Sequence, residues 1–529
     1  MSDLPRTIAQ AAHLIEARQL SPVELVKGLL QRIESVDPII HSFLTVTAEH
    51  ALKQARAAED DIAHGRYRGP LHGIPFGAKD NYETAGIRTT GHSKAYAEYV
   101  PHRNAAVIDK LDESGAVLMG KLALHELAHG GPSFDLPWPL ARNPWNPTHF
   151  TGGSSSGSGA AVAAGLVLFA LGSDTGGSIR TPASLCGLVG IKPTFGLVSR
   201  YGVIPNCYSL DHCGPMANTV EDCAILLQAM AFHDSRDRSS ASSIASGFRN
   251  YLRQDLEGVR IGVVRHFWEE ELPASPELRE STEEALRVLA SLGARLEDVR
   301  LRPVRDYCDV WTLIEAPETF SIQRKALLER AHDFGRIFLE RTLLACLIDA
   351  ADYTDAQRAR SRFVDEVQAL WRDHDVLFTA GAGPAPVLSP ALATWPNVNR
   401  FSPFAVTGNP AVVVPSGLSK DGLPMSVQFV GAPFRDAQVL GIAHAYERAG
   451  GLAQRRANVS SLAQPPEIPY ETPALTTEGF DRETVRLCTA AANQAGLALT
   501  DGQLALLCST APRVFDMKER VRRLVSPRS

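Results

Sequence analysis

The sequence predicts an α/β fold, in which helices flank a mixed central β-sheet, with a small helical extension at the C-terminus. Two observations predict it. Short apolar runs alternate with segments of helical periodicity through most of the chain, and the pattern changes to helix alone near the end. The chain has 529 residues, which exceeds the usual size of a domain with a single hydrophobic core. Either one large domain with insertions or two domains are therefore expected.

The first expected element is a helix that begins at Pro22, because Ser21 and Glu24 form a capping-box pattern before an apolar face. Helices are also expected at 220–231, 276–292 and 437–449, and an almost continuous helical pattern at 312–373 predicts a cap over the core. Buried strands are expected at the short apolar runs 74–78, 116–119, 167–171, 259–264, 376–378 and 411–414.

The chain changes character after Gln464, where a run of prolines predicts a stiff linker. We therefore divide the chain into a main domain at 1–460, a linker at 461–476 and a helical extension at 477–529. The extension is expected to hold a helix over 482–495 and a second one that begins near Thr500, where Gln503 completes a capping box. About fifty residues make a poor independent domain, so the extension is expected to pack on something else.

The bulk composition is that of an ordinary folded protein, with 44% hydrophobic residues, 21% charged residues and a formal net charge of −6. Such a small charge does not indicate a nucleic-acid partner. The most apolar stretch, 160–171, is shorter than a membrane span, so no membrane association and a cytoplasmic location are expected. The eight cysteines have no CxxC spacing, which indicates free thiols.

The most informative segment contains two clusters of glycine and serine, at 151–159 and 172–180. Glycines let backbone N–H groups approach a ligand closely, as an oxyanion cradle requires, and a serine beside such a cradle is a candidate nucleophile. A flexible linker would not enclose the apolar run between the clusters. A phosphate loop would need Gly-Lys-Ser/Thr after a cluster, and the dinucleotide-binding GxGxxG does not follow the first strand signal.

An activated serine needs a base. Lysine is then a candidate, provided that burial lowers its pKa enough for a neutral amine near pH 7. Lys79 meets this condition, because it ends the apolar, strand-like run 73–80.

These segments resemble the amidase signature family. The matching motifs are 73–80, 152–159, 172–180 with the following Thr181-Pro182-Ala183, and the later landmarks 192–196 and 422–428. The resemblance covers roughly residues 5–455 and implies the amidase signature fold for 1–460, with hydrolysis of a carboxamide C–N bond and no cofactor.

The resemblance also implies a Ser-cisSer-Lys triad, in which Lys79 is the base, Ser154 is a relay after a cis peptide bond, and Ser178 attacks the carbonyl and forms an acyl-enzyme. The implied oxyanion hole consists of the backbone N–H groups of Thr175, Gly176, Gly177 and Ser178. Three further motif residues have implied supporting roles: Ser155, Asp174 and Arg180.

A second motif, the HExxH pattern of zinc proteases, occurs at His125 to His129. That pattern needs both histidines on one continuous helix and a third ligand downstream. Gly130, Gly131 and Pro132 follow at once and end any helix there, so no metal site is expected.

The substrate pocket is expected at three segments: 125–139, 310–345 and 397–404. Aromatic residues and prolines in the first of them indicate an apolar, rigid wall, so we favour a small or aryl amide as substrate. The residues proposed to bind it are His129, Gly130, Phe134 and Trp138.

Three alternatives stay open at this point. The same acyl chemistry serves carbamates, ureas and biuret-type compounds, and the glutaminase subunit of a transfer-RNA amidotransferase shares the motifs. The third alternative is not an enzyme, but an inactive binding protein with the same fold. The extension is similar to the small helical accessory subunits of carboxybiuret-type hydrolases, which implies a homodimer. The sequence does not name the natural substrate.

Overall fold

The computed structural model describes residues 4–242, 247–393, 398–451 and 456–526. Its centre is a mixed sheet with the strand order β1-β3-β2-β6-β8-β7-β12-β13-β11-β9-β10. The α/β fold with a mixed sheet is therefore confirmed. The strands of this sheet are β1 (Phe43–Val46), β2 (Pro75–Lys79), β3 (Val117–Leu122), β6 (Phe169–Asp174), β7 (Val189–Lys192), β8 (His212–Ala217), β9 (Arg260–Val263), β10 (Arg295–Asp298), β11 (Val376–Ala380), β12 (Ala411–Leu418) and β13 (Pro424–Val430).

The strands that matter most for the site lie side by side. β2 pairs in parallel with both β3 and β6, while β6 pairs antiparallel with β8. β2, β3 and β6 are buried along their whole length. A separate two-stranded ladder joins β4 (Arg142–Asn143) to β5 (Asn146–Phe150).

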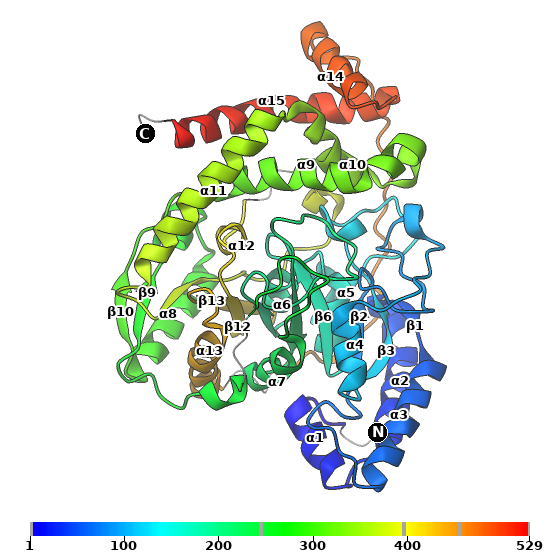
Figure 1. The fold of residues 1–529 in the computed structure, drawn as a ribbon, viewed down its shortest axis with the longest axis vertical. Helices are drawn as coiled ribbons and strands as arrows, with labels where there is room; N and C mark the ends of the chain where they lie inside the picture. Colours follow the sequence, from blue (N-terminus) through cyan, green and yellow to red (C-terminus); the bar gives the residue numbers. More distant parts are fainter. Residues whose placement is uncertain (1–3, 243–246, 394–397, 452–455, 527–529) are drawn as a thin grey trace.

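Helices pack around this sheet (Figure 1), and the apolar core lies between the helices and the sheet. Ser21 caps the predicted N-terminal helix, since its side chain accepts hydrogen bonds from the N–H groups of Val23 and Glu24. The helices of this layer are α1 (Ile8–Glu16), α2 (Pro22–Ile40), α3 (Ala48–Ala63), α4 (Ala106–Glu113), α5 (Ser156–Ala163), α6 (Arg180–Leu185), α7 (Val220–Met230), α8 (Pro276–Ser291), α12 (Ser402–Val406) and α13 (Asp436–Gly450).

The predicted helical segment after residue 312 forms three helices: α9 (Val304–Arg330), α10 (Arg336–Leu343) and α11 (Ala350–Leu370). They lie together at one end of the molecule, beyond the sheet (Figure 1), and we call them the cap. Asp349 begins α11 with a capping box.

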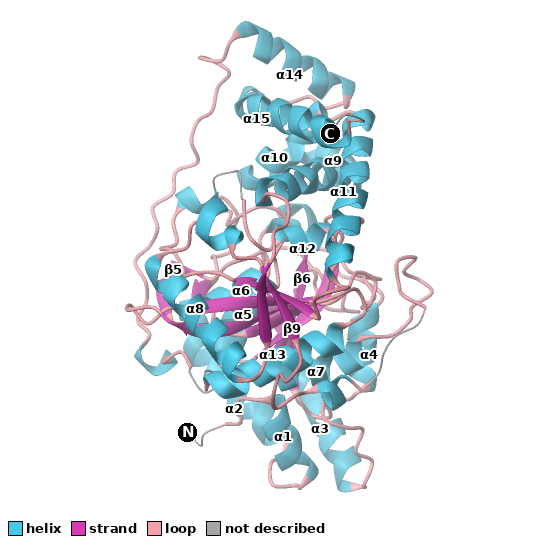
Figure 2. Cartoon of the chain, turned by 90° about the vertical axis from the view of Figure 1, so that its left-hand side faces the viewer, coloured by secondary structure: helices cyan, strands magenta, loops and turns pink. Residues whose placement is uncertain are grey.

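The C-terminal extension also folds as predicted, into α14 (Arg482–Gln494) and α15 (Asp501–Val525), and Thr500 and Gln503 form the expected capping box. α15 packs on the cap, with contacts to α9, α10 and α11. The segment that leads to it runs as an extended loop along the outside of the molecule (Figure 2).

All eight cysteines are free. Within the described part of the chain, no helix combines the length and the apolar character that crossing a bilayer demands.

Candidate active site

The two parallel strands β2 and β6 bring the lysine to the glycine-rich clusters. β2 ends at Lys79 and β6 ends at Asp174, and Ala78 lies opposite Leu171 across the ladder. Because the carboxyl ends of adjacent parallel strands meet at one edge of a sheet, Lys79 lies beside both clusters. The first cluster leads into α5 and the second leads into α6.

Lys79 is fully buried between two hydroxyl groups. Its Nζ atom lies 2.8 Å from Ser154 Oγ and 2.8 Å from Ser173 Oγ. Burial lowers the pKa of Lys79 to about 7, against the opposing effect of the Asp174 carboxylate. A large share of the amine is therefore neutral at neutral pH. The peptide bond between Gly153 and Ser154 is cis, as the resemblance implies for the relay serine.

Ser178 lies closer to solvent than Lys79 and Ser154, since it is only half-buried. The two clusters touch here, because the Ser155 N–H donates to the Ser178 carbonyl over 3.2 Å. Ser178 also lines a cavity of about 750 Å³, together with Gly153 and the loop Thr175 to Gly177. The hydroxyl of Ser178 is therefore accessible to a ligand in this cavity.

The backbone of the 175–178 loop is fixed from two sides. Trp311 of α9 donates its indole N–H to the Thr175 carbonyl over 3.0 Å, and the Gly177 N–H donates to Asp174 Oδ1 over 2.7 Å. The Gly177 N–H thus has an acceptor within the protein, and the oxyanion hole at 175–178 stays a prediction. Within the described residues, no protein acceptor is recorded for the N–H groups of Thr175, Gly176 and Ser178.

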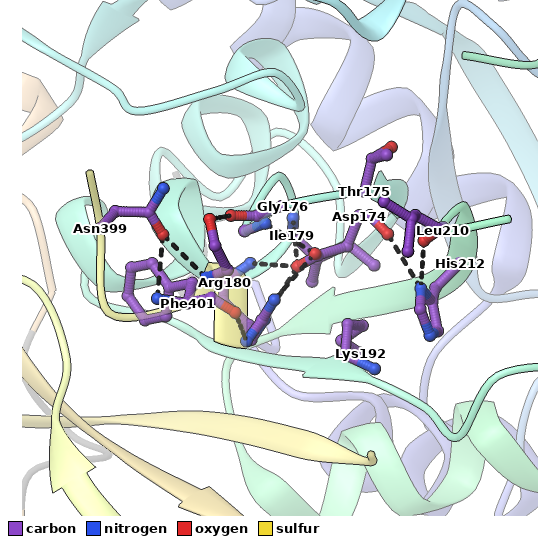
Figure 3. A network of polar contacts seen from close by, with 12 residues as sticks. Asp174, Thr175, Gly176, Ile179, Arg180, Lys192, Leu210, His212, Asn399 and Phe401 are labelled. Atoms are coloured by element: carbon purple, nitrogen blue, oxygen red, sulfur yellow. Dashed lines mark hydrogen bonds and ion pairs between the residues drawn. The ribbon is translucent and has the colours of Figure 1, made fainter. Parts of the chain in front are cut away.

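Asp174 and Arg180 form a fully buried ion pair at the turn between β6 and α6 (Figure 3). Arg180 donates to both carboxylate oxygens of Asp174 over 2.9 Å. Burial raises the pKa of Asp174, but the charge and hydrogen bonds of Arg180 outweigh it and hold that pKa below its usual range. Arg180 also donates to the Phe401 carbonyl and to Gln428 Oε1. The pair thus ties the loop to β13.

Ser155 supports the same region, since its Oγ donates to the Ser173 carbonyl over 3.2 Å. Ser173 is not among the expected site residues, although it lies inside the second cluster. Asn81 donates to the Ser173 hydroxyl over 3.2 Å, so this hydroxyl is held on two sides.

The HExxH segment does not form the helix that a zinc protease requires. Residues Glu126–Ala128 make a short 3-10 turn, in which Leu127 and Ala128 adopt left-handed backbone angles. His125 Nδ1 lies 3.1 Å from the Gly130 carbonyl, whereas His129 Nδ1 lies 3.4 Å from Glu315 Oε1. The two imidazoles therefore have separate partners.

All three segments expected at the substrate pocket contribute residues to the cavity at Ser178. Gly130 lines it, and the cap contributes Trp311, Glu315 and Arg341 from the expected segment 310–345. From 397–404, the lining includes residues 398–401, whereas Asn397 lies outside the described residues.

Three of the proposed binding residues are not part of the cavity lining. Phe134 packs against Tyr470 of the linker, Trp138 lies edge-on to His92, and His129 is buried beside Glu315. The substrate-binding roles of these three residues therefore stay predictions. Four charged side chains also stand in the lining: Glu271, Glu315, Arg341 and Arg400. No local pattern in the sequence indicates them.

Comparison with known proteins identifies the family of this chain. A family profile described as Amidase matches residues 24–440. The chain belongs to the amidase signature family. The C-terminal helices lie outside the matched range.

Several amidase relatives are similar over most of the chain. A glutamyl-tRNA(Gln) amidotransferase subunit from Carboxydothermus hydrogenoformans is 38% identical over 82% of this chain and 95% of its own length. The structure of peptide amidase from Stenotrophomonas maltophilia superposes with a TM-score of 0.76 and 30% identity, covering 86% of this chain and 99% of its own. A structure described as a vestigial protein complex that reveals the origins of an s-triazine catabolic enzyme gives a TM-score of 0.79 at 32% identity, over 84% and 98% of the two chains.

Proposed function

We propose that this amidase-family chain hydrolyses the C–N bond of a small amide or ureide through an acyl-enzyme at Ser178. The observation that carries the proposal is the buried amine of Lys79, with a pKa of about 7 and a distance of 2.8 Å to Ser154 Oγ. A neutral amine in this position has a lone pair for a hydroxyl proton.

In the proposed reaction, Lys79 takes the proton of Ser154 while Ser154 takes the proton of Ser178. Ser178 Oγ then attacks the substrate carbonyl, and the N–H groups at 175, 176 and 178 face the oxyanion. The proton returns through Ser154 to the leaving nitrogen as the C–N bond breaks. Water releases the acyl group by the same relay in reverse. The chain's own residues supply every step, and the expectation of no cofactor stays a prediction.

The cavity supports a substrate that carries a carboxylate. Arg341 is only 6% exposed and lines the cavity at Ser178. Burial lowers the pKa of Arg341 to about 10, so its guanidinium stays charged at neutral pH. A carboxylate is the planar, two-oxygen group that a guanidinium binds best. We therefore place an acidic substrate ahead of the neutral aryl amide that the sequence favours.

A second candidate is the glutaminase subunit of a transfer-RNA amidotransferase. The names of the curated relatives favour it, and glutamine carries a carboxylate. Carbamates, ureas and biuret-type compounds remain within the first candidate, because the chemistry at Ser178 is the same.

The test is covalent labelling by a fluorophosphonate, followed by mass spectrometry of the modified peptide. The unaltered chain should be labelled at Ser178, and Ser178→Ala should lose labelling and amide hydrolysis by at least about 1,000-fold. Ser156→Ala is the matched control, because Ser156 belongs to the same clusters but starts α5. Persistent turnover in folded Ser178→Ala would show that the nucleophile is another group, and an unlabelled, inactive chain would favour the binding-protein alternative.

Assays with L-glutamine, 4-nitroacetanilide and a ureide that carries a carboxylate distinguish the candidate substrate classes. An acid-specific pocket predicts turnover of the first or third compound, and a loss of at least about 10-fold in kcat/KM on Arg341→Met. Glutaminase activity that requires an added partner protein would favour the second candidate. Preference for 4-nitroacetanilide with no effect of Arg341→Met would contradict the acidic substrate.

A further inference from the structure

The linker and α15 each contact a segment that contributes residues to the cavity at Ser178. On one side, Tyr470 of the linker packs against Phe134 at a ring distance of 5.5 Å. Phe134 follows closely on Gly130, Gly131 and Pro132, which line the cavity. On the other side, α15 lies across the cap at the far end of the molecule from the N-terminus (Figure 1).

Three cations of α15 bind two carboxylates of the cap. Arg520 Nε lies 2.5 Å from Asp309 Oδ2 and Arg520 Nη2 lies 3.1 Å from Asp309 Oδ1. Asp352 of α11 accepts from Lys518 over 2.6 Å and from Arg522 over 2.7 Å. The bidentate contact of Arg520 fixes the orientation of α15 relative to α9, because two guanidinium nitrogens bind the two carboxylate oxygens of Asp309.

The contact at Asp309 lies two positions before a residue of the site. Asp309 is 5% exposed on α9, and Trp311 on the same helix donates to the Thr175 carbonyl of the oxyanion loop. A side chain added at Gly176 would approach the Trp311 ring to 3.0 Å, so the loop and the ring are in close contact. Glu315 lies one turn further along α9 and lines the cavity.

We propose that Arg520 is a positioning residue, which holds α9 through Asp309. Trp311 and Glu315 thereby keep their positions in the cavity relative to Ser178. The proposal deepens the proposed function, because it assumes that ligands of Ser178 bind in this cavity. The C-terminal extension thereby becomes part of the substrate site, although the sheet that carries Lys79 and the clusters is complete without it.

The physical reason is that small displacements matter at a reacting centre. Binding groups that move by about 1 Å lose much of the advantage of orientation. Arg520 touches neither Lys79 nor Ser154, so its loss should act through α9, by displacing Glu315 in the cavity lining and Trp311 against the oxyanion loop.

The test is the kinetics of labelling by an alkyl fluorophosphonate, resolved into the saturation constant KI and the maximal rate kinact. Arg520→Met should lower kinact/KI by about 10-fold, which is the loss of roughly one charge-assisted contact. Arg520→Lys should restore part of the change, because it keeps the charge. Arg523→Met is the control, since Arg523 is 73% exposed and pairs with Glu519 on its own helix.

Hydrogen–deuterium exchange gives a readout that does not depend on catalysis. Arg520→Met should speed exchange in peptides that cover 304–316 and 174–179, and Arg523→Met should not. Unchanged kinact/KI and unchanged exchange in Arg520→Met would overturn the proposal, as would equal effects of Arg520→Met and Arg523→Met. No labelling of the unaltered chain would overturn the proposed function itself, whereas normal labelling with no effect of Arg520 would overturn only this inference.

Discussion

The amine of Lys79 has two hydroxyl neighbours, and only Ser154 belongs to the expected relay. Ser173 Oγ lies equally close to Nζ, at 2.8 Å. A neutral amine needs its lone pair for Ser154, so its N–H groups remain for Ser173. Ser173 therefore orients the lone pair toward the relay.

The residue-scale prediction concerns this second hydroxyl. Ser173→Ala should lower kcat by about 5- to 10-fold with little change in KM, because it removes one hydrogen bond worth about 1 kcal/mol from the base. Steady-state kinetics on the best substrate of the panel give both constants. Ser158→Ala is the control, because Ser158 is a buried serine that donates to the Leu171 carbonyl. An unchanged kcat in Ser173→Ala would show that the amine is oriented without Ser173.

At the scale of elements, the turn between β6 and α6 depends on the pair of Asp174 and Arg180. Asp174→Asn leaves a buried guanidinium without its charge partner, so the free energy of unfolding should fall by about 3 kcal/mol. Equilibrium unfolding in urea measures this free energy. Asp298→Asn breaks the exposed pair with Arg265 and should cost less than about 1 kcal/mol. Equal effects of the two substitutions would contradict a structural role for the buried pair.

The sequence predicts elements well where apolar residues run together and poorly elsewhere. The strand at 376–378 becomes β11, and the helix at 276–292 becomes α8. The pattern misses β8 because Gly214 and Pro215 interrupt it, and both residues normally indicate a turn. It also misses β10, because all four residues of that strand are exposed at the edge of the sheet and form no apolar run.

At the scale of the whole molecule, the sequence predicts some residues of the site and not others. The motifs at 73–80 and 172–180 predict Lys79 and the oxyanion loop, because their spacing is local. Arg341 enters the cavity from the cap, and Arg520 reaches Asp309 across 211 positions of sequence. Such contacts depend on how helices pack, which no local pattern encodes. The domain boundaries at 460 and 476, the homodimer and the cytoplasmic location stay predictions.

The central claim, that Lys79 is a neutral base, is tested most directly by the pH dependence of Ser178 labelling. The labelling rate should rise with pH and level off, with a midpoint near 7, because the amine must lose its proton before it can accept another. Lys79→Ala should label far more slowly at every pH. A midpoint near the ordinary lysine value of 10.5, or a rate that does not change with pH, would contradict the account.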